Sequence, residues 1–467
     1  MMKETAQPPR TYVLGLLFVG VLMAALDIAI VGPALPAIQR DFQVSEQALA
    51  WVFSLYVLGN LVGTPAIAAL SDHLGRRRIY TLSIAGFALG SLIVALAPSF
   101  AVLLIGRLVQ GISAGGIFPV ASAVVGDTFP PEKRGSALGL LGAVFGIAFL
   151  IGPILGGVLL LFGWPWLFLI NLPIALVMII ASLRLLPTQS VAVKSRFDLL
   201  GTLMLGAALS ALAYGLTVLD PAQLAQGQLD PLAVPMLIAA VLLFPVFIWV
   251  EQRATDPIVQ PALFRSRPIR LIAVLAVGAG IAETAIVFIP SLLTLAFGVS
   301  VSTASFMLLV IVLSMAVGSP VSGRMLDRLG SRLVIIGGTL LSATGLLLLG
   351  LFPLNLVVFY LSSVLLGLGL AVLLGSALRY VLLNETAASD RAAAQGLLTV
   401  TMGVGQLLGA VLVGLIATTA TQPLDGYARA FLSIGIFMGG LTLAALGLHD
   451  RATERARALE LSSSVSR

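Results

Sequence analysis

Two acidic residues interrupt long apolar runs of the chain, at matching places in its two halves. Asp27 lies within residues 12–36, and Glu283 lies within residues 269–293. A charged side chain in hydrocarbon costs at least ~2.5–3.5 kcal/mol on insertion scales, and such residues mark pathways and relays. Burial disfavours the ionised carboxylate, so such a group can take up and release a proton or pair with a cation. The two acids indicate a membrane pump or transporter with protons as its coupling ion.

One basic side chain, Arg107, is placed within a span at a depth comparable to that of Asp27. If the two helices are neighbours, the arginine favours the charged form of Asp27, and its withdrawal favours protonation. The alternative is an arginine that extends to the outer interface. The sequence leaves a conformational proton switch and an interfacial anchor both open.

The composition predicts an all-α polytopic membrane protein. Of the 467 residues, 59% are hydrophobic and 10% charged, and the mean hydropathy is +1.09. Soluble domains carry about 25% charged residues. Apolar runs of the length that a bilayer requires recur fourteen times, at 12–36, 47–69, 79–98, 101–125, 135–161, 165–186, 199–219, 231–252, 269–293, 302–323, 333–352, 355–382, 392–419 and 427–448.

The distribution of positive charge predicts the orientation. Most Lys and Arg residues fall in the loops and tails that are cytoplasmic if the N-terminus is inside, as the positive-inside rule requires. Both termini are therefore expected in the cytoplasm, and the protein in the cell inner (plasma) membrane. The net charge of +6 then reflects topology, and we expect no nucleic-acid partner. Without cysteine, and with only His73 and His449 outside the spans, we expect no metal site and no cofactor.

The chain repeats itself after about 256 residues. Residues 134–139 match residues 391–396 at an offset of 257, and residues 72–77 match residues 327–332 at an offset of 255. The two acids are 256 residues apart. These offsets predict two pseudo-symmetric six-helix bundles with two helices inserted between them. Parallel halves of this kind are one known plan of transporters.

The repeat also predicts the domain boundaries. The inserted helices have no charge within their spans apart from Glu251 at the end of the second one, and we expect them to face lipid. The predicted domains are an N-terminal bundle (1–187), the inserted helices 7 and 8 with their linkers (188–267), a C-terminal bundle (268–449) and a cytoplasmic tail (450–467).

Several segments carry recognisable motifs. Residues 68–78 read Ala-Ala-Leu-Ser-Asp-His-Leu-Gly-Arg-Arg-Arg, and a second copy with an initial Gly begins at residue 323. Residues 107–111 read Arg-Leu-Val-Gln-Gly, and residues 26–36 read Leu-Asp-Ile-Ala-Ile-Val-Gly-Pro-Ala-Leu-Pro. Together with glycines in the fifth span and residues 164–173, these segments resemble the major facilitator superfamily and, within it, the fourteen-helix drug:proton antiporters. The chain departs from the family pattern at Ala29, Gly32, Pro33, Ala68, His73 and Pro165.

The resemblance implies functional roles for the motif residues. Proton coupling and substrate binding would fall to Asp27, Glu283 and Arg107. The inner gate would comprise Asp72, Gly75, Arg76, Arg77, Asp127, Asp327, Gly330 and Arg332, and the antiporter motif Gly146, Gly152, Pro153, Gly156 and Gly157. Topology-setting charge is the alternative for Arg77, and helix packing alone is the alternative for the glycines.

Few polar side chains lie inside the spans. Tyr56, Asn60 and Gln110 are the candidates for lining a cavity, and such sparse polar anchors suit a lipophilic substrate. No lysine lies in a span, which disfavours a multiply anionic substrate, while Arg107 alone leaves a monoanion possible. The sequence contains no phosphate-binding loop and no catalytic arrangement, so we expect neither ATP-driven transport nor an enzyme.

These observations predict a proton-coupled exporter of lipophilic, cationic compounds that works by rocker-switch alternating access. Its expected partners are a small lipophilic substrate, protons and membrane lipids, and we expect a monomer. A lipid or glycolipid exporter of the same superfamily would use the same acids and stays open. A proton-coupled uptake symporter is the second alternative, and the antiporter motif argues against it.

Overall fold

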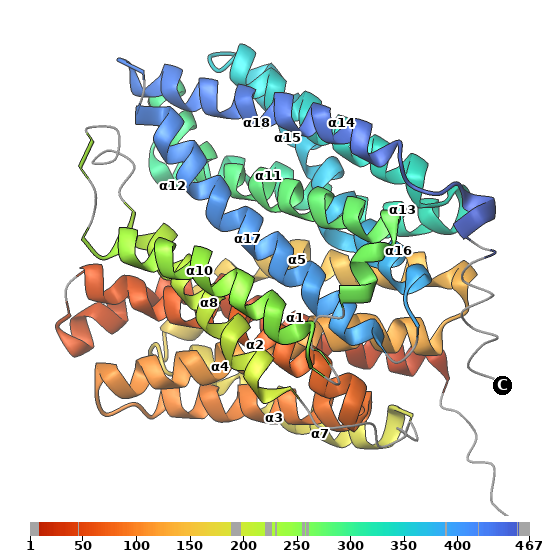
Figure 1. Ribbon diagram of the computed structural model, residues 1–467. Helices are drawn as coiled ribbons and strands as arrows, with labels where there is room; N and C mark the ends of the chain where they lie inside the picture. Colours follow the sequence, from red (N-terminus) through yellow and green to blue (C-terminus); the bar gives the residue numbers. More distant parts are fainter. Residues whose placement is uncertain are drawn as a thin grey trace, which may run out of the picture. The chain divides into compact units, whose positions relative to one another are not determined.

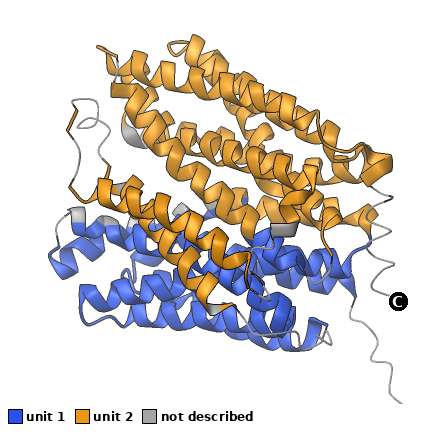
Figure 2. Cartoon of the chain, viewed as in Figure 1, with its two compact units in different colours: residues 1–130, 147–197, 388–396 blue, residues 131–146, 198–387, 397–467 orange. Residues whose placement is uncertain are grey.

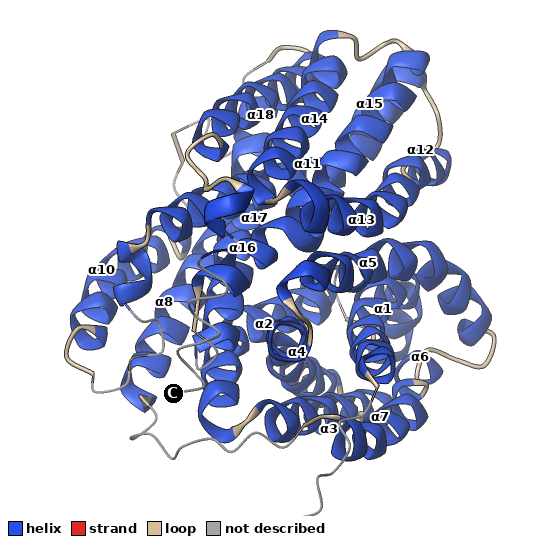
Figure 3. Ribbon diagram, turned by 90° about the vertical axis from the view of Figure 1, so that its right-hand side faces the viewer, coloured by secondary structure: helices blue, strands red, loops and turns tan. Residues whose placement is uncertain are grey.

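The chain is helical throughout the residues that the computed structural model describes, which are 9–44, 46–187, 198–219, 227–228, 231–254, 257, 261–387, 390–418, 420–454 and 456. Figure 3 shows these residues as helices and connecting loops, without a strand among them. Thirteen described helices are long and apolar enough to cross a membrane, and residues Leu200–Leu216 form a shorter apolar helix. The predicted all-helical class is confirmed. The fourteenth span and the cytoplasmic placement of both ends stay predictions.

The helices follow the chain in the order shown in Figure 1. The first set comprises α1 (Arg10–Phe42), α2 (Glu46–Leu74), α3 (Arg76–Ala95), α4 (Phe100–Thr128), α5 (Pro131–Leu160), α6 (Trp166–Leu169), α7 (Asn171–Leu185), α8 (Leu199–Val218) and α10 (Ala233–Glu251). The second set comprises η1 (Pro261–Arg265), α11 (Arg267–Phe297), α12 (Val301–Met307), α13 (Leu309–Leu329), α14 (Ser331–Leu351), α15 (Leu356–Leu370), η2 (Ala371–Ala377), α16 (Leu378–Glu385), α17 (Arg391–Thr418) and α18 (Pro423–Ala445).

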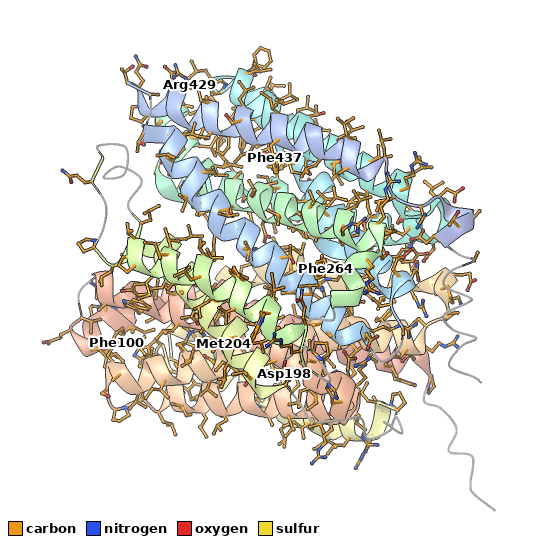
Figure 4. The ribbon with its side chains drawn as sticks, viewed as in Figure 1. Phe100, Asp198, Met204, Phe264, Arg429 and Phe437 are labelled. Carbon is orange, nitrogen blue, oxygen red and sulfur yellow. The ribbon has the colours of Figure 1, made fainter. Side chains whose placement is uncertain are left out.

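Local signals account for several helix ends. In a membrane every backbone polar group must be satisfied internally, which makes long helices the natural element of an apolar chain. At the start of α8 the carboxylate of Asp198, which is labelled in Figure 4, accepts a hydrogen bond from the Gly201 N–H (2.7 Å), an N-cap arrangement. Pro423 opens α18 in its first turn, where a missing N–H costs nothing. Gly75 and Gly330, with φ of 94° and 83°, make the tight turns before α3 and α14.

Three predicted spans are interrupted helices. Residues 165–186 form α6 and α7, and residues 302–323 form α12 and most of α13. Residues 355–382 contain the π-helical turn η2 between α15 and α16. Such turns insert an extra residue into a helix and often accompany functional sites.

The described helices form two compact units, shown in separate colours in Figure 2. Unit 1 comprises residues 1–130, 147–197 and 388–396, and unit 2 comprises residues 131–146, 198–387 and 397–467. In unit 1, Ile30 and Ile38 of α1 pack with Val52, Leu103 and Phe168 in a buried apolar cluster. In unit 2, α14 packs against α15 and α18, and α8 packs against α10. The first part of α5 thus groups with unit 2 and the start of α17 with unit 1, while the predicted domain boundaries stay predictions.

Candidate functional site

Asp27 of α1 and Arg107 of α4 form a buried ion pair in unit 1. The Arg107 Nη1 atom lies 2.6 Å from Asp27 Oδ2. The exposed fractions of the two side chains are 0% for Arg107 and 1% for Asp27. An arginine this deeply buried does not extend to a membrane interface, so the structure favours the pairing over the interfacial anchor. A buried pair of this kind is strongly destabilised when one partner is removed.

Three neutral side chains complete the surroundings of the Asp27 carboxylate. Gln110 of α4 donates to Asp27 Oδ1 from 3.1 Å, and Asn171 of α7 donates to the same atom from 3.3 Å. Both amides also donate to Ser91 Oγ of α3, at 2.7 Å and 3.1 Å. Side chains from four helices therefore form one hydrogen-bonded network around the Asp27 carboxylate. We call Asp27, Ser91, Arg107, Gln110 and Asn171 the Asp27 network.

The Arg107 guanidinium has further partners besides Asp27. Its Nε donates to the backbone carbonyl of Val52 (3.0 Å), and its Nη1 donates to Gln110 Oε1 (2.9 Å). The Tyr56 ring lies under the guanidinium, with 4.4 Å between the arginine Cζ and the ring centroid, a cation–π contact. Tyr56 and Gln110 are buried, so both serve the ion pair in this structure. Asn60, one turn after Tyr56, is half-buried, and its carbonyl accepts from the Thr64 hydroxyl (2.6 Å).

Glu283 of α11 sits in a different environment in unit 2. Its Oε2 accepts a hydrogen bond from Gln406 Nε2 of α17 at 2.7 Å. The neighbouring Thr284 hydroxyl donates to the Gln406 carbonyl (2.9 Å). Glu283 is half-buried whereas Asp27 is fully buried. The two acids share a sequence register, but one is enclosed beside an arginine and the other is partly open beside an amide.

Two glycines bring α11 and α17 close together beside Glu283. A Cβ atom added to Gly280 would lie 2.1 Å from the Met402 carbonyl oxygen, and one added to Gly405 would lie 2.2 Å from the Val277 carbonyl oxygen. Both positions therefore exclude any side chain. The close approach places Gln406 within reach of Glu283.

A charged cluster lies at the turn between α2 and α3 in unit 1. Arg76 pairs with Asp72, and its Nε lies 3.1 Å from Asp127 Oδ2 at the end of α4. Arg391, the first residue of α17, lies 2.6 Å from Asp127 Oδ1 and donates to the Gly126 carbonyl (3.0 Å). Arg76 and Asp127, both residues of the predicted inner gate, are thus in contact, and Arg391 is a partner that the sequence did not suggest.

Asp72 also caps the start of α17 within unit 1. Its two carboxylate oxygens accept hydrogen bonds from the Ala392 N–H (3.2 Å) and the Ala393 N–H (2.7 Å). The first turn of a helix has unpaired N–H groups and a positive partial charge, so a carboxylate there is stabilising. Asp72 therefore joins the α2–α3 turn to the beginning of α17.

Asp327 makes the corresponding contact in unit 2. Its carboxylate accepts from the Gly135 N–H and the Ser136 N–H, both at 2.9 Å, and from the Ser136 hydroxyl. Arg134, one residue earlier in α5, donates to the Asn384 side chain of α16 (2.9 Å). The α13–α14 turn is thus joined to the beginning of α5.

The remaining candidate gate residues play smaller parts in these contacts. Gly75 and Gly330 supply the positive φ of the two turns. Arg77 is half-buried and its carbonyl accepts from the Thr81 hydroxyl (2.7 Å), and Arg332 is half-buried. Hydrogen bonds from Thr453 lower the pKa of the Asp450 carboxyl, and the charge of Arg332 adds to this effect.

The glycines of the antiporter motif differ in their surroundings. A Cβ at Gly146 would lie 2.6 Å from the Cβ of Ala316, and one at Gly152 would lie 2.5 Å from the Cβ of Ala29. Gly156 is buried, whereas a Cβ at Gly157 would meet nothing within 4 Å. The Pro153 side chain lies outside the described residues. Close helix contact is therefore a property of Gly146 and Gly152 and not of Gly157.

A second arginine is buried within a membrane span, which corrects the expectation that Arg107 is alone. Arg379 belongs to the span Leu356–Glu385, and its exposed fraction is 4%. Its Nη2 donates to the Thr399 hydroxyl (3.3 Å). Arg379 lies near the end of the predicted apolar run 355–382, so the sequence predicts that its charge belongs with the cytoplasmic loops.

The comparisons with known proteins agree with one family. Residues 17–282 and 271–464 match the family model described as Major Facilitator Superfamily. The chain is 34% identical over 414 residues to "Uncharacterized MFS-type transporter YfiU" of Bacillus subtilis (strain 168), covering 87% of this chain and 80% of that protein. It is 34% identical over 409 residues to the "Tetracenomycin C resistance and export protein" of Streptomyces glaucescens, covering 85% and 74%.

Two further similarities cover nearly the same length. The chain is 32% identical over 429 residues to "Puromycin resistance protein pur8" of Streptomyces alboniger, covering 89% of this chain and 83% of that protein. The crystal structure of the human organic anion transporter MFSD10 (TETRAN) superposes with a TM-score of 0.71 at 20% identity, covering 94% of this chain and 100% of that chain; this likeness speaks for the fold. The chain therefore belongs to the major facilitator superfamily, and it is a multi-pass membrane transporter with drug-resistance and export proteins among its relatives.

Proposed function

We propose that the protein is a proton-coupled exporter of lipophilic, cationic compounds in the cell inner (plasma) membrane. Relatives named for drug resistance and export at 32–34% identity support the export of small molecules. The observation that carries the proton coupling is the Asp27 network, in which one buried carboxylate faces one buried guanidinium. The protein acts as a monomer with fourteen membrane spans and both termini in the cytoplasm.

Proton uptake at Asp27 would change the balance of the network. The ionised carboxylate attracts Arg107 across 2.6 Å, and protonation removes that attraction while leaving the guanidinium charged. Arg107 retains its bonds to the Val52 carbonyl and Gln110 Oε1. The proton therefore weakens the link between α1 and α4 in particular, and this weakening couples protonation to helix movement.

Glu283 is the acid that we assign to the substrate. It is half-buried and its bonded partner is a neutral amide, so its charge is available to a cation. A substrate cation would displace the Gln406 amide or share the carboxylate with it. A proton and a substrate cation would compete because both bind the same carboxylate. Substrate release is therefore favoured when Glu283 is protonated.

The two inner turns supply the conformational part of the proposal. Asp72 and Asp327 each bind the start of a long helix, and breaking these contacts would open the inner side. Alternating access then follows as the two halves of the chain move against each other, in the rocker-switch manner.

Transport by the purified protein in liposomes tests the proposed function. With an acidic lumen, a cationic dye should accumulate inside the vesicles, and adding the dye should raise the lumenal pH as protons leave. Accumulation driven by a basic lumen would indicate symport, and movement of a fluorescent lipid instead of the dye would indicate a lipid exporter. Dye uptake that ignores the pH gradient would overturn proton coupling.

A further inference from the structure

The two halves of the chain differ at the inner turn in one respect. In unit 1, Arg76 at the start of α3 binds Asp127 at the end of α4, with 3.1 Å between Nε and Oδ2. The matching positions in unit 2 are Ser331, 255 residues after Arg76, and Asn384, 257 residues after Asp127. Serine and asparagine cannot form an ion pair, so the second half lacks this link between its turn and the neighbouring helix.

Glu454, from the segment after α18, occupies the corresponding place in unit 2. Its Oε2 accepts a hydrogen bond from the Ser331 N–H at the start of α14 (3.1 Å), and the Asn384 side chain hydrogen-bonds to the same carboxylate. The exposed fraction of Glu454 is 4%, which is unusual for a glutamate near the end of a chain. One side chain therefore joins the start of α14 to the end of α16, as Arg76 and Asp127 join α3 to α4.

The segment that carries Glu454 is itself built to dock. Asp450 caps it through a hydrogen bond from the Thr453 N–H (3.1 Å), and the Glu454 N–H donates to the Asp450 carbonyl (3.0 Å). Arg451 Nη2 donates to the Asp327 backbone carbonyl (3.3 Å). A Cβ at Gly330 would lie 2.8 Å from the Arg451 Cβ, so the turn is shaped to receive this segment. Residues 450–454 rest directly on the α13–α14 turn.

The contact reaches the start of α5 through Asp327. The residue whose carbonyl binds Arg451 uses its carboxylate to bind the Gly135 and Ser136 N–H groups. Asn384, which binds Glu454, also accepts from Arg134 (2.9 Å). Both ends of the docked segment therefore touch residues that hold α5.

We propose that residues 450–454 form a latch on the α13–α14 turn of unit 2. In this latch Glu454 supplies the acid that position 384 lacks. The docked segment thereby positions Asp327 and Asn384, which bind the start of α5. The latch is a positioning device and contacts neither substrate nor proton path. Its effect on transport rests on the proposed function, because the latch would hold contacts that break when the inner side opens. Undocking of the segment frees the α13–α14 turn and loosens its hold on α5.

Cysteine accessibility on this naturally Cys-free chain tests the latch without any substrate. Ala137, in the first part of α5, is buried, and an Ala137→Cys reporter should react with a maleimide faster when the turn releases α5. Glu454→Ala should speed labelling by about tenfold or more, since it leaves the Ser331 N–H without its acceptor. Glu454→Gln, which keeps an acceptor for the Ser331 N–H, should stay near the parent rate.

Two controls separate a latch from general damage. Asp425→Ala removes an exposed acid of α18 and should leave labelling unchanged. A Ser331→Cys and Glu454→Cys double variant, oxidised to a disulfide before the maleimide is added, should label slowly at an Ala137→Cys reporter, and reducing that disulfide should restore the faster labelling. Parent-like labelling in Glu454→Ala, in protein that elutes as the parent does, would overturn the proposal. Because no drug or proton gradient is used, this outcome is independent of whether the proposed export activity is correct.

Discussion

Asp72 and Asp327 make the same contact in opposite halves of the internal repeat. Asp72 accepts the N–H groups of residues 392 and 393, and Asp327 accepts those of residues 135 and 136. The two pairs of N–H groups are themselves 257 residues apart. Each half thus offers an acid from one turn and a helix start from elsewhere in the chain. An acid adds nothing to membrane topology, which is why both residues point to a role in the gate.

Neutralising either acid should weaken these helix caps. We expect Asp72→Asn and Asp327→Asn each to raise the reactivity of a cysteine placed near the inner turn and to reduce transport, while the protein stays folded. An amide can accept at only one oxygen, so one of two charge-assisted bonds is lost, at a cost of roughly 1.5–3 kcal/mol. Asp425→Asn, at an exposed acid of α18, is the control. Unchanged reactivity in both variants would refute a gating role.

Asp27→Asn should abolish proton-coupled transport. The asparagine oxygen can still accept from Gln110 and Asn171, but the variant loses the titratable group and leaves the buried Arg107 charge unpaired, which is destabilising. Variant protein that elutes as the parent does is therefore used for the assay. The measurement is proton release from vesicles on dye addition, alongside dye uptake across pH. Ser91→Ala, which removes a shared acceptor but no charge, should retain coupling. Proton release at the parent level in Asp27→Asn would contradict the proposal.

Glu283→Gln should separate substrate charge from proton coupling. We expect Glu283 to matter most for divalent or bulky cations. In the variant only Asp27 would remain, and one carboxylate balances too little of the charge of such a cation. We therefore expect a strong loss of divalent dye export and a partial loss of monovalent dye export, each followed in inverted vesicles. Gln406→Leu, which removes the amide partner (2.7 Å) but keeps the acid, serves as the comparison. Equal losses for both dyes would reject this division of labour.

The broad architecture and one central pair were predictable from the sequence. Hydropathy marks the spans because the bilayer imposes their length, and the depth of Asp27 and Arg107 along their helices suggested the pair that the structure contains. The partners Ser91 and Asn171 were not predictable. Hydrogen-bond partners depend on how each helix is rotated about its axis, and apolar residues cover both the lipid-facing and the buried sides.

The inner turns show a similar limit. The repeat revealed Asp72 and Asp327, but their partners are backbone N–H groups, which every residue possesses and no pattern marks. The mismatch of Ser331 and Asn384 with Arg76 and Asp127 was visible in the repeat, yet the sequence predicted only a cytoplasmic tail for residues 450–467. The described part, up to residue 456, instead docks at Glu454. The π-helical turn Ala371–Ala377 also left no signal, since its residues are as apolar as their neighbours.

Gly152→Leu should stall the transport cycle. A Cβ at this position would lie 2.5 Å from the Ala29 Cβ of α1, so a leucine forces α5 away from the helix that carries Asp27. Overpacking typically costs ~1–3 kcal/mol, enough to shift a two-state equilibrium by about ten- to a hundredfold. Gly157→Leu is the matched control, because nothing lies within 4 Å of its added Cβ. Equal transport by the two variants would show that the contact at residue 152 is not needed for the cycle.

Docking of the segment after α18 should depend on pH. Burial raises the pKa of the Glu454 carboxyl, and the nearby Glu385 carboxylate adds to this effect. An undocked glutamate titrates near ~4.3, so the docked state holds the proton more tightly and docking is strongest below the raised pKa. Docking should weaken as the pH rises through the window above ~4.3.

Hydrogen exchange of the Ser331 N–H, corrected for intrinsic exchange, reports this docking. Its protection should fall with rising pH in the parent protein, while Glu454→Gln, which cannot titrate, should show constant protection. A pH dependence that persists in the glutamine variant would assign the effect to a group other than Glu454.

Because α11 and α17 are in close contact, the hydrogen bonding of Glu283 depends on the position of α17 along α11. Gly280 and Gly405 keep the two backbones in contact, and Gln406 follows Gly405 directly. Any sliding of α17 by one residue along α11 would carry the amide about 1.5 Å along the axis, which is half the length of a hydrogen bond. Glu283 would then lose its hydrogen bond from Gln406 without moving itself. A displacement of α17 along α11 would therefore change the affinity of Glu283 for a cation, because it would break the hydrogen bond from Gln406.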